Sequence, residues 1–591
     1  MCIRDRPKPN IIVFFTDQQR WDTSGLHGNP LSLMENFDHY AMENTHLFNS
    51  FTCQPVCGPA RASLQSGMYA TRTGCYKNKI PLKQNINTLA KYLKKQGYST
   101  GYIGKWHLGS SEPVKKEDRG GYDYWLASNL LEFTSDAYET YVYDNQNKKV
   151  FLPGYRVDAI TDAAINFIKS NQKKPFFLFV SLIEPHHQNN TDDYPPPIGY
   201  REKYTGKWSP PDLDALVGSA PRHLGGYYGM VKRIDEAYGR MIDVVKSLKL
   251  FDDSAIIFTS DHGNNFRTRT REYKRSCHES SIRVPTSFIG NMFQQGGRIK
   301  ELTNILDIHA TILDLGKVKN TSHCDGKSII PLVNKTSRNW ENEIFIQISE
   351  SELARSLRTS KWKYCISDLT SNGNDKPSSD NYTETSLYDL DADPYELNNL
   401  IGINFSTKFS PWLALGFISP RQIYAYLKDY ELKFLANEST YWIFFELLWR
   451  DFFRFIFIKY GDKFFYKSGL GLNPVKINHN AKNLEAWIKG KTSNSFINAG
   501  MIELYKTGFL SNRMRQIVAS YFVNELSCDW RSGASWFESQ LIDYDVYSNY
   551  GNWAYIAGCG TDPRGGRHFN IEKQRKVYDP DGIYQQIWNK S

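Results

Sequence analysis

The stretch GGYYGMVKRIDEAYGRMIDVVKSLKL (225–250), followed by SAIIFTSDHG (254–263), decides the fold class of the first part of the chain. The first segment predicts a long helix, and the second predicts a buried strand that ends in polar residues. The same alternation recurs in NIIVFFTD (10–17), VDAITDAAINFIKSN (157–171) and PFFLFVSLIEPH (175–186). Alternating strands and helices predict a mostly parallel sheet with helices on both faces.

The pattern changes twice further along the chain. EIFIQIS (343–349), RSLRTSKWKYCIS (355–367) and SLYDLDADPYELNNL (386–400) predict the short strands of a small antiparallel subdomain. After Leu400 the segments are helical throughout, which predicts an all-α domain. We therefore predict four parts: residues 1–6, a non-native segment derived from a sequencing adapter; 7–335, a catalytic domain; 336–400, its C-terminal subdomain; and 401–591, a helical domain.

The composition is that of a globular protein with two unlike parts. Of 591 residues, 40% are hydrophobic and 23% charged, which is ordinary for soluble domains. No apolar run approaches the ~20 residues that cross a bilayer, so we predict no membrane span. Residues 403–591 carry an excess of six positive charges and eight of the 14 tryptophans. Cys53 and Cys75 are compatible with a disulfide or with two buried free thiols.

Cys57-Gly58-Pro59-Ala60-Arg61 matches the pattern C-x-P-x-R. The chain from about Pro9 to Leu400 thereby resembles the type I sulfatases, which implies an alkaline-phosphatase-like α/β fold. The resemblance also implies that a formylglycine-generating or anaerobic sulfatase-maturing enzyme oxidises Cys57 to formylglycine. One hydroxyl of the hydrated aldehyde would attack sulfur and release the alcohol, and loss of the other proton would expel sulfate.

Polar clusters at the predicted strand ends strengthen this resemblance, because open α/β sheets place their sites there. The resemblance implies a Ca²⁺ site whose ligands are Asp17, Gln18, Cys57, Asp261 and His262. It implies catalytic and sulfate-binding roles for Cys57, Arg61, Lys105, His107, His186 and Lys274. Cations around a group that gains negative charge supply electrostatic stabilisation, and His186 would protonate the leaving oxygen.

Two features bear on the substrate. Glutamine at position 18 replaces the second acidic residue of many sulfatases, which leaves a carbonyl oxygen but less ligand charge. An arginine-rich loop points to an acidic substrate such as a sulfated glycan, or is simply a solvated basic loop; its arginines are Arg267, Arg269, Arg271 and Arg275. Related phosphodiesterases and phosphonate hydrolases share this fold, so phosphate esters remain an alternative to sulfate esters.

NFSTKFSPWLALGFISPRQIY (404–424), together with DWRSGASWFESQLIDYDVYSNYGNW (529–553), resembles the FAD-binding domain of photolyases and DASH-type cryptochromes. The resemblance implies FAD contacts from Ser406, Thr407, Lys408, Phe409, Ser410, Glu446, Arg450, Asn512, Arg515, Asp543, Asp545 and Asn549. Positive charge and tryptophans also suit a DNA surface, although we interpret Trp442, Trp449 and Trp536 as helical core.

This second resemblance has clear departures. Trp530 and Trp553 occupy the inner two positions of the electron-transfer relay, but Ile477 stands at the outer one, so we predict that the relay is cut. Ser493, Ser495 and Asn498 also depart from the family pattern. The antenna domain and the first part of the FAD-binding domain are replaced by the sulfatase-like part. We therefore expect a truncated FAD-binding domain with impaired flavin binding.

We interpret the chain as a Ca²⁺-dependent sulfatase joined near 400–402 to a partial cryptochrome domain. Three alternatives stay open: a FAD-dependent blue-light photoreceptor, a DNA photolyase, and an artefactual fusion in which neither half is fully functional. Because no linker separates the halves, we favour recombination or misassembled sequence over an evolved bifunctional enzyme. The halves point to different compartments, periplasmic or secreted for the first and cytoplasmic for the second, so the localisation stays unassigned.

Overall fold

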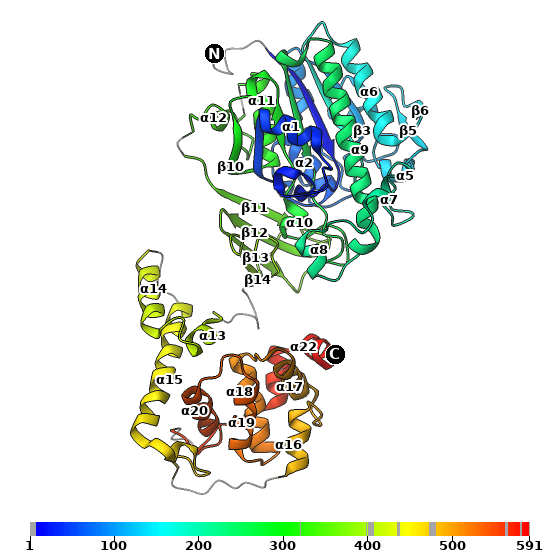
Figure 1. Ribbon diagram of the computed structural model, residues 1–591. Coiled ribbons are helices and arrows are strands. Elements are labelled where there is room, and N and C mark those ends of the chain that lie inside the picture. Colours follow the sequence, from blue (N-terminus) through cyan, green and yellow to red (C-terminus); the bar gives the residue numbers. More distant parts are fainter. Residues whose placement is uncertain are drawn as a thin grey trace. The chain divides into compact units, whose positions relative to one another are not determined.

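The computed structural model describes residues 8–319, 321–337, 339–397, 399, 407–433, 436, 438–471, 480–561, 565–579 and 582–589. The chain divides into two compact units, Met1–Ile401 and Gly402–Ser591. The first unit contains sheets and helices and the second is helical (Figure 1). Each unit is described by itself below.

A ten-stranded sheet forms the centre of the first unit, in the order β10-β2-β9-β8-β1-β7-β3-β4-β5-β6. Two groups of neighbouring strands are parallel: β8, β1, β7, β3 and β4 form one, and β10 and β2 form the other. The remaining strands, β9, β5 and β6, pair antiparallel with their neighbours. The prediction of a mostly parallel sheet is confirmed. The strands are β1 (Asn10–Thr16), β2 (Thr45–Phe51), β3 (Ser99–Lys105), β4 (Tyr124–Ser128), β5 (Thr140–Tyr143), β6 (Lys149–Leu152), β7 (Phe176–Ser181), β8 (Ser254–Ser260), β9 (Ser287–Ile289) and β10 (Gly297–Asn304).

Helices cover both faces of this sheet, and the central strand shows why. In β1, Ile12 and Phe14 pack in one buried cluster, whereas Val13 and Phe15 pack in the other, because successive side chains of a strand point to opposite faces. One cluster lies under α1 (Glu35–Glu43), α6 (Arg156–Ser170) and α9 (Ala220–Ser247). The other lies under α2 (Cys57–Ser66), α4 (Leu89–Lys95) and α11 (Ile305–Leu315).

The helix expected at 225–250 is longer at its start and shorter at its end, since α9 spans Ala220–Ser247. It contains the Gly225-Gly226 pair, which would ordinarily weaken a helix. A Cβ at Gly226 would lie 2.3 Å from the backbone oxygen of Tyr194. Glycine is therefore required here for close packing rather than for a turn.

A four-stranded antiparallel sheet follows, in the order β11-β12-β13-β14, and confirms the predicted small subdomain. Its strands are β11 (Glu343–Ile348), β12 (Leu353–Thr359), β13 (Trp362–Asp368) and β14 (Thr383–Asp389). It packs on the main sheet through a buried apolar cluster that contains Phe51, Ile282 and Ile346. A buried ion pair joins the two as well, with Lys363 Nζ 3.1 Å from Glu279 Oε1.

The described part of the second unit consists of helices without strands, which confirms the predicted all-α domain. Its longer helices are α14 (Pro420–Lys433), α15 (Glu438–Tyr460), α16 (Ala481–Ile488), α17 (Ser495–Thr507), α18 (Asn512–Ser520), α19 (Trp530–Gln540), α20 (Val546–Ile556) and α21 (Ile571–Tyr578). Trp487, Trp530 and Trp553 lie in one buried cluster. Trp442 is 50% exposed, so its interpretation as core is wrong. Among the described helices, none combines the length and apolarity needed to cross a membrane.

The described cysteines of the first unit form no disulfides. Cys53 and Cys75 are free and buried, so the disulfide alternative is wrong. Burial raises the pKa of Cys53 to about 12 and that of Cys75 to about 11, which makes both thiols unreactive.

Candidate functional site

The carboxyl ends of four neighbouring strands bring the predicted polar residues together. Asp17 directly follows β1, Asp261 and His262 follow β8, and Lys105 is the last residue of β3. His186 follows β7, five residues beyond its end. Parallel strands end at one edge of the sheet, so residues more than 200 positions apart meet there. All five of these side chains are buried.

Cys57 is the first residue of α2, and the helix presents its amino-terminal end to this edge. The Cys57 sulfur lies 2.7 Å from Lys274 Nζ, 3.3 Å from His262 Nε2 and 3.5 Å from Asp17 Oδ1. Burial opposes ionisation of the thiol, but Lys105, Lys274 and His262 outweigh it and place the pKa of Cys57 well below its ordinary value. The environment therefore stabilises negative charge at this position.

A cage of cations surrounds the Asp17 carboxylate. Lys105 Nζ lies 2.8 Å and Arg61 Nη2 3.0 Å from Asp17 Oδ2. Arg61 also donates from Nε to Asp261 Oδ2 at 3.2 Å and from Nη1 to Ser181 Oγ at 2.7 Å. Burial raises the pKa of Asp17, but the nearby cations outweigh it and hold this pKa well below its usual range.

Four of the five predicted metal ligands form one cluster. One ligand atom from each of Asp17, Cys57, Asp261 and His262 lies within 4.8 Å of the others. His262 donates from Nδ1 to the carbonyl of Gly263 at 2.9 Å, because a carbonyl only accepts. Its Nε2 faces the cluster, 3.3 Å from the Cys57 sulfur. The donor set fits a divalent cation, since carboxylates and an oriented imidazole are common ligands.

Gln18 lies beside this cluster and contacts it through its backbone N–H. Its backbone has a φ of 68°, and its N–H donates to Asp261 Oδ1 at 3.1 Å. Its side-chain oxygen lies 3.4 Å from His187 Nδ1, and its buried Nε2 has no hydrogen-bond partner among the described residues. Gln18 thus orients Asp261 through its backbone, and its amide would have to turn to ligate a metal.

The remaining predicted catalytic side chains face the same cavity, of about 840 Å³, which Cys57, His107, His186 and Lys274 help to line. His186 donates from Nδ1 to the carbonyl of His187 at 2.6 Å, so its Nε2 accepts from Lys274 Nζ at 3.1 Å. Burial and then Lys274 lower the pKa of His186, which keeps this imidazole neutral. In this arrangement the proton of the pair resides on Lys274.

The structure adds two residues that the sequence did not reveal. Glu132 is buried, lines the cavity and pairs with Lys105 Nζ at 3.1 Å. Asn78 accepts from the backbone N–H of Gly58 at 3.0 Å and so supports the start of α2. Neither residue lies in a recognisable motif, and no sequence signal marks them.

Positive charge dominates the cavity wall, which includes Lys77, Lys79, Arg267, Arg271 and Arg275. Arg267 pairs with Asp192 at 2.9 Å, and Arg275 pairs with Glu272 and Glu350. Among the described residues, Lys79 and Arg271 have no carboxylate within ion-pair distance. The fourth arginine of the loop, Arg269, donates to the carbonyl of Tyr395 at 2.6 Å instead.

The second unit contains a small pocket of about 90 Å³. Its lining includes five of the predicted FAD-contacting residues: Asn512, Arg515, Asp543, Asp545 and Asn549. Arg515 Nη2 pairs with Asp543 at 2.8 Å, and Arg450 Nη2 pairs with Asp545 at 2.9 Å. The residue types fit the edge of a flavin. The volume is too small for one, because ligand pockets usually measure at least ~300 Å³.

The other residues predicted for this unit are scattered. Glu446 lies on α15 four residues before Arg450 and is exposed. Lys408 precedes α13 (Phe409–Ala414), which contains Phe409 and Ser410, and Thr407 lies just before it. Trp530 and Trp553 are buried in the helical core, and Trp553 also lines the pocket. Ser406 and Ile477 lie outside the described residues.

Comparisons with known proteins agree with this division. The family model "Sulfatase" matches residues 9–318, and "N-sulphoglucosamine sulphohydrolase, C-terminal" matches residues 272–410. The chain therefore belongs to the sulfatase family, a class of sulfuric ester hydrolases. The family model "FAD binding domain of DNA photolyase" matches residues 442–590, so a photolyase-type domain follows the sulfatase part.

Solved structures share the fold of the first unit at low sequence identity. A putative sulfatase from Bacteroides fragilis is 23% identical with a TM-score of 0.58, and the match covers 72% of this chain and 96% of that one. A protein solved in complex with its substrate D-glucosamine-2-N,6-O-disulfate is 21% identical with a TM-score of 0.55, over 73% and 99% of the two chains. The phosphonate monoester hydrolase of Agrobacterium radiobacter is 19% identical with a TM-score of 0.52, over 69% and 94%.

Curated relatives match the second unit. Cryptochrome DASH of Danio rerio is 55% identical over 191 residues, which are 32% of this chain and 37% of the relative. Cryptochrome DASH of Synechocystis is 52% identical over 191 residues, which are 32% of this chain and 39% of the relative. The chain thus spans less than two fifths of the length of these cryptochromes.

Proposed function

We propose that the first unit hydrolyses sulfate esters of an anionic glycan through formylglycine formed at Cys57. The observation that carries this proposal is the position of Cys57, because its sulfur lies at the start of α2 among Lys274, His262 and Asp17. The sulfur marks the place that the two hydroxyls of a hydrated aldehyde would take. A formylglycine-generating or anaerobic sulfatase-maturing enzyme would carry out the oxidation.

The side chains around Cys57 suit the two halves of this reaction. One hydroxyl of the hydrated aldehyde loses its proton to solvent and attacks sulfur, the S–O bond to the alcohol breaks, and the alcohol oxygen takes a proton from the Lys274–His186 pair. The other hydroxyl then returns a proton to this pair, which reforms the aldehyde C=O and expels sulfate. Lys105 and Lys274 would neutralise the charge that develops on the sulfuryl oxygens.

The proton for the alcohol would come from the Lys274–His186 pair, because Lys274 Nζ already donates to His186 Nε2 at 3.1 Å. In the chain with an unmodified Cys57, burial lowers the pKa of Lys274, but Cys57 and Asp17 outweigh it and raise this pKa above its ordinary value. This assignment extends the expected role of His186 to a pair of residues.

A divalent cation would complete the site, held by Asp17, Asp261, His262 and the residue at position 57, with Gln18 beside them. When bound, it would polarise the sulfate ester and favour the ionised nucleophile. The carboxylates suit Ca²⁺, whereas the imidazole of His262 suits Mn²⁺ or another transition metal better. Activity of the metal-stripped enzyme restored by Ca²⁺ alone would support the Ca²⁺ expected from the sequence, and restoration by Mn²⁺ alone would contradict it.

Substrate recognition would rest on the unpaired cations of the cavity wall. Lys79 and Arg271 lie where further anionic groups of a sulfated sugar chain would reach. Exposed charge pairs contribute about 0.5–1 kcal/mol each, so Lys79→Gln or Arg271→Gln should each raise KM about two- to fivefold and leave kcat nearly unchanged. Lys300→Gln, an exposed residue outside the cavity lining, is the matched control.

The test of the proposal uses the full chain expressed together with a formylglycine-generating enzyme. Release of sulfate from a sulfated glucosamine and from an aryl sulfate is compared with release of the phenol from an aryl phosphonate. Cys57→Ala should abolish sulfate release, and Cys75→Ala, which removes another buried thiol, should not. A Cys57→Ala variant that retains turnover, or a preference for the phosphonate, would overturn the proposal.

For the second unit we propose a residual flavin-binding edge rather than an intact photoreceptor, photolyase or DNA-binding surface. This proposal is supported by a pocket of about 90 Å³ that Arg515, Asp543 and Asp545 help to line. Arg515 pairs with Asp543, and Asp545 pairs with Arg450. FAD would have to displace both pairs, so weak binding is expected. We further propose domain boundaries at 335/336 and 400/401, with residues 1–6 a non-native segment derived from a sequencing adapter.

A further inference from the structure

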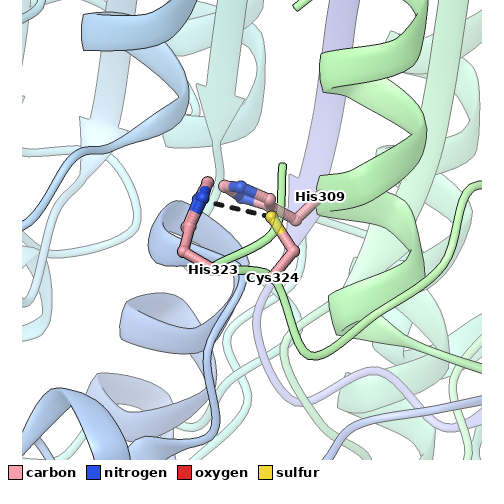
Figure 2. Close-up of side chains that lie close together, drawn as sticks. All are labelled: His309, His323 and Cys324. Atoms are coloured by element: carbon pink, nitrogen blue, oxygen red, sulfur yellow. Dashed lines mark hydrogen bonds between the residues drawn. The ribbon is translucent and has the colours of Figure 1, made fainter. Parts of the chain in front are cut away.

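We propose that His309, His323 and Cys324 form a second metal site, for Zn²⁺, remote from the catalytic cluster. One ligand atom from each of these three residues lies within 4.8 Å of the others. Figure 2 shows His309 coming from a helix while His323 and Cys324 come from a loop, with the side chains converging. Two imidazoles and one thiolate are ligands that zinc binds readily, and water would take the fourth position.

His309 provides the most specific evidence. It lies on α11, is fully buried, and its Nδ1 lies 2.7 Å from the backbone oxygen of Leu64. Since a carbonyl only accepts, Nδ1 carries the hydrogen and Nε2 carries the free lone pair. His309 Nε2 has no hydrogen-bond partner among the described residues. A buried polar atom without a partner costs free energy, and a metal ion would supply the missing interaction.

His323 and Cys324, the other two proposed ligands, also lie in positions that suit zinc binding. His323 Nε2 lies 3.3 Å from Cys324 Sγ, close to the ~3.5 Å that separates nitrogen and sulfur ligands around tetrahedral zinc. His323 Nδ1 lies 3.3 Å from the Tyr92 hydroxyl, and its ring stacks on that of Tyr92 with centroids 5.0 Å apart. Each histidine thus holds an outer partner on Nδ1 and presents Nε2, as metal-bound histidines usually do.

Hydrogen bonds of Asp325 hold the loop that carries His323 and Cys324, and they do not use the proposed ligand atoms. Asp325 donates its backbone N–H to the Gly67 carbonyl at 2.8 Å and accepts from the Tyr69 N–H at 2.9 Å. A Cβ at Gly67 would lie 2.8 Å from His309 Nε2 and 3.0 Å from Cys324 Sγ. Glycine at position 67, with a φ of 74°, therefore allows the two ligands to approach each other.

The placement suggests a structural purpose. Leu64 lies in the last turn of α2, the helix that begins at Cys57, so the metal would connect the far end of this helix to α11 and to the loop. The carboxyl end of a helix also favours a nearby cation. Zinc binding would therefore stabilise the element that positions the catalytic residue, without entering the reaction.

The test uses Co²⁺ as a spectroscopic probe of the metal-free full chain in a Cys57→Ala background, which removes the only thiol of the catalytic cluster. A thiolate-to-cobalt charge-transfer band is expected in the difference spectrum, lost in Cys324→Ser and in His323→Gln, and retained in Cys75→Ser. Zn²⁺ should displace the cobalt and abolish the band. Absence of the band in the Cys57→Ala protein, or its survival in Cys324→Ser, would overturn the proposal.

A second measurement tests the proposal if the Cys324→Ser variant folds poorly. Gly67→Ala keeps all three ligands but obstructs their approach, so it should weaken Zn²⁺ binding at least tenfold by competition with a chelator. Gly28→Ala is the matched control, because Gly28 also has a positive φ, of 94°, and nothing lies within 4 Å of its added Cβ. Equal Zn²⁺ affinity in the two glycine variants would contradict the site.

Discussion

Replacement of Lys105 by methionine separates the electrostatic role of this residue in catalysis from its role in stability. The Lys105 ammonium is fully buried and lies 2.8 Å from Asp17 Oδ2 and 3.1 Å from Glu132 Oε1. Asp17 retains Arg61 as a second cation. Glu132 has no other ion-pair partner among the described residues, so Lys105→Met leaves a buried carboxylate unpaired.

The magnitudes follow from these contacts. Breaking a buried ion pair by removing one partner costs about 3–5 kcal/mol, so Lys105→Met should lower the free energy of unfolding of the first unit by that amount. Removing a group that stabilises transition-state charge costs about 10²–10³ in kcat. The double variant Lys105→Met/Glu132→Gln removes the unpaired charge, and it should recover most of the stability but none of the activity.

The assay combines urea unfolding with initial rates of sulfate release for the wild type, the two single variants and the double variant. Glu132→Gln alone should reduce kcat less than tenfold, because its side chain keeps the shape of the cavity wall. A double variant that regains activity along with stability would refute the reasoning. In that case Lys105 would serve only to neutralise its carboxylate neighbours.

Three further predictions concern other parts of the chain. Burial raises the pKa of Asp235 from the ordinary 3.8 to about 6. Its contribution to the free energy of unfolding is therefore complete below about pH 3.8 and is lost as pH rises through about 6, a loss of about 3 kcal/mol. Urea unfolding measured across this pH range should show that decrease in the wild type and not in Asp235→Asn. The purified full chain should be colourless, and titration with FAD should produce no tightly bound flavin absorbance; a yellow protein at stoichiometric FAD would contradict the small volume of the pocket. A single long read of source DNA across codons 395–410 should fail to span the junction if the fusion is an artefact, and an uninterrupted read would establish it as natural.

The local sequence was sufficient for the architecture and for most of the polar cluster at the sheet edge. Alternating apolar segments predicted the parallel sheet, and the polar residues after β1 and β8 were placed at its edge because parallel strands end together. The five-residue pattern beginning at Cys57 predicted a nucleophile there, and the structure places Cys57 beside Asp17, Asp261 and His262. The positions of these residues could be predicted because they depend on neighbouring residues and on a general rule of sheet topology.

Other features depend on contacts between distant residues, which no local pattern encodes. Glu132 reaches Lys105 from a segment without a motif. The side chain of Gln18 faces His187 rather than the cluster of Asp17, Cys57, Asp261 and His262. His309 and Cys324 meet only because Gly67, some 240 positions before His309, leaves room between them. Burial, ion pairing and metal ligation are properties of side chains in three dimensions, and the packing of the folded chain sets them.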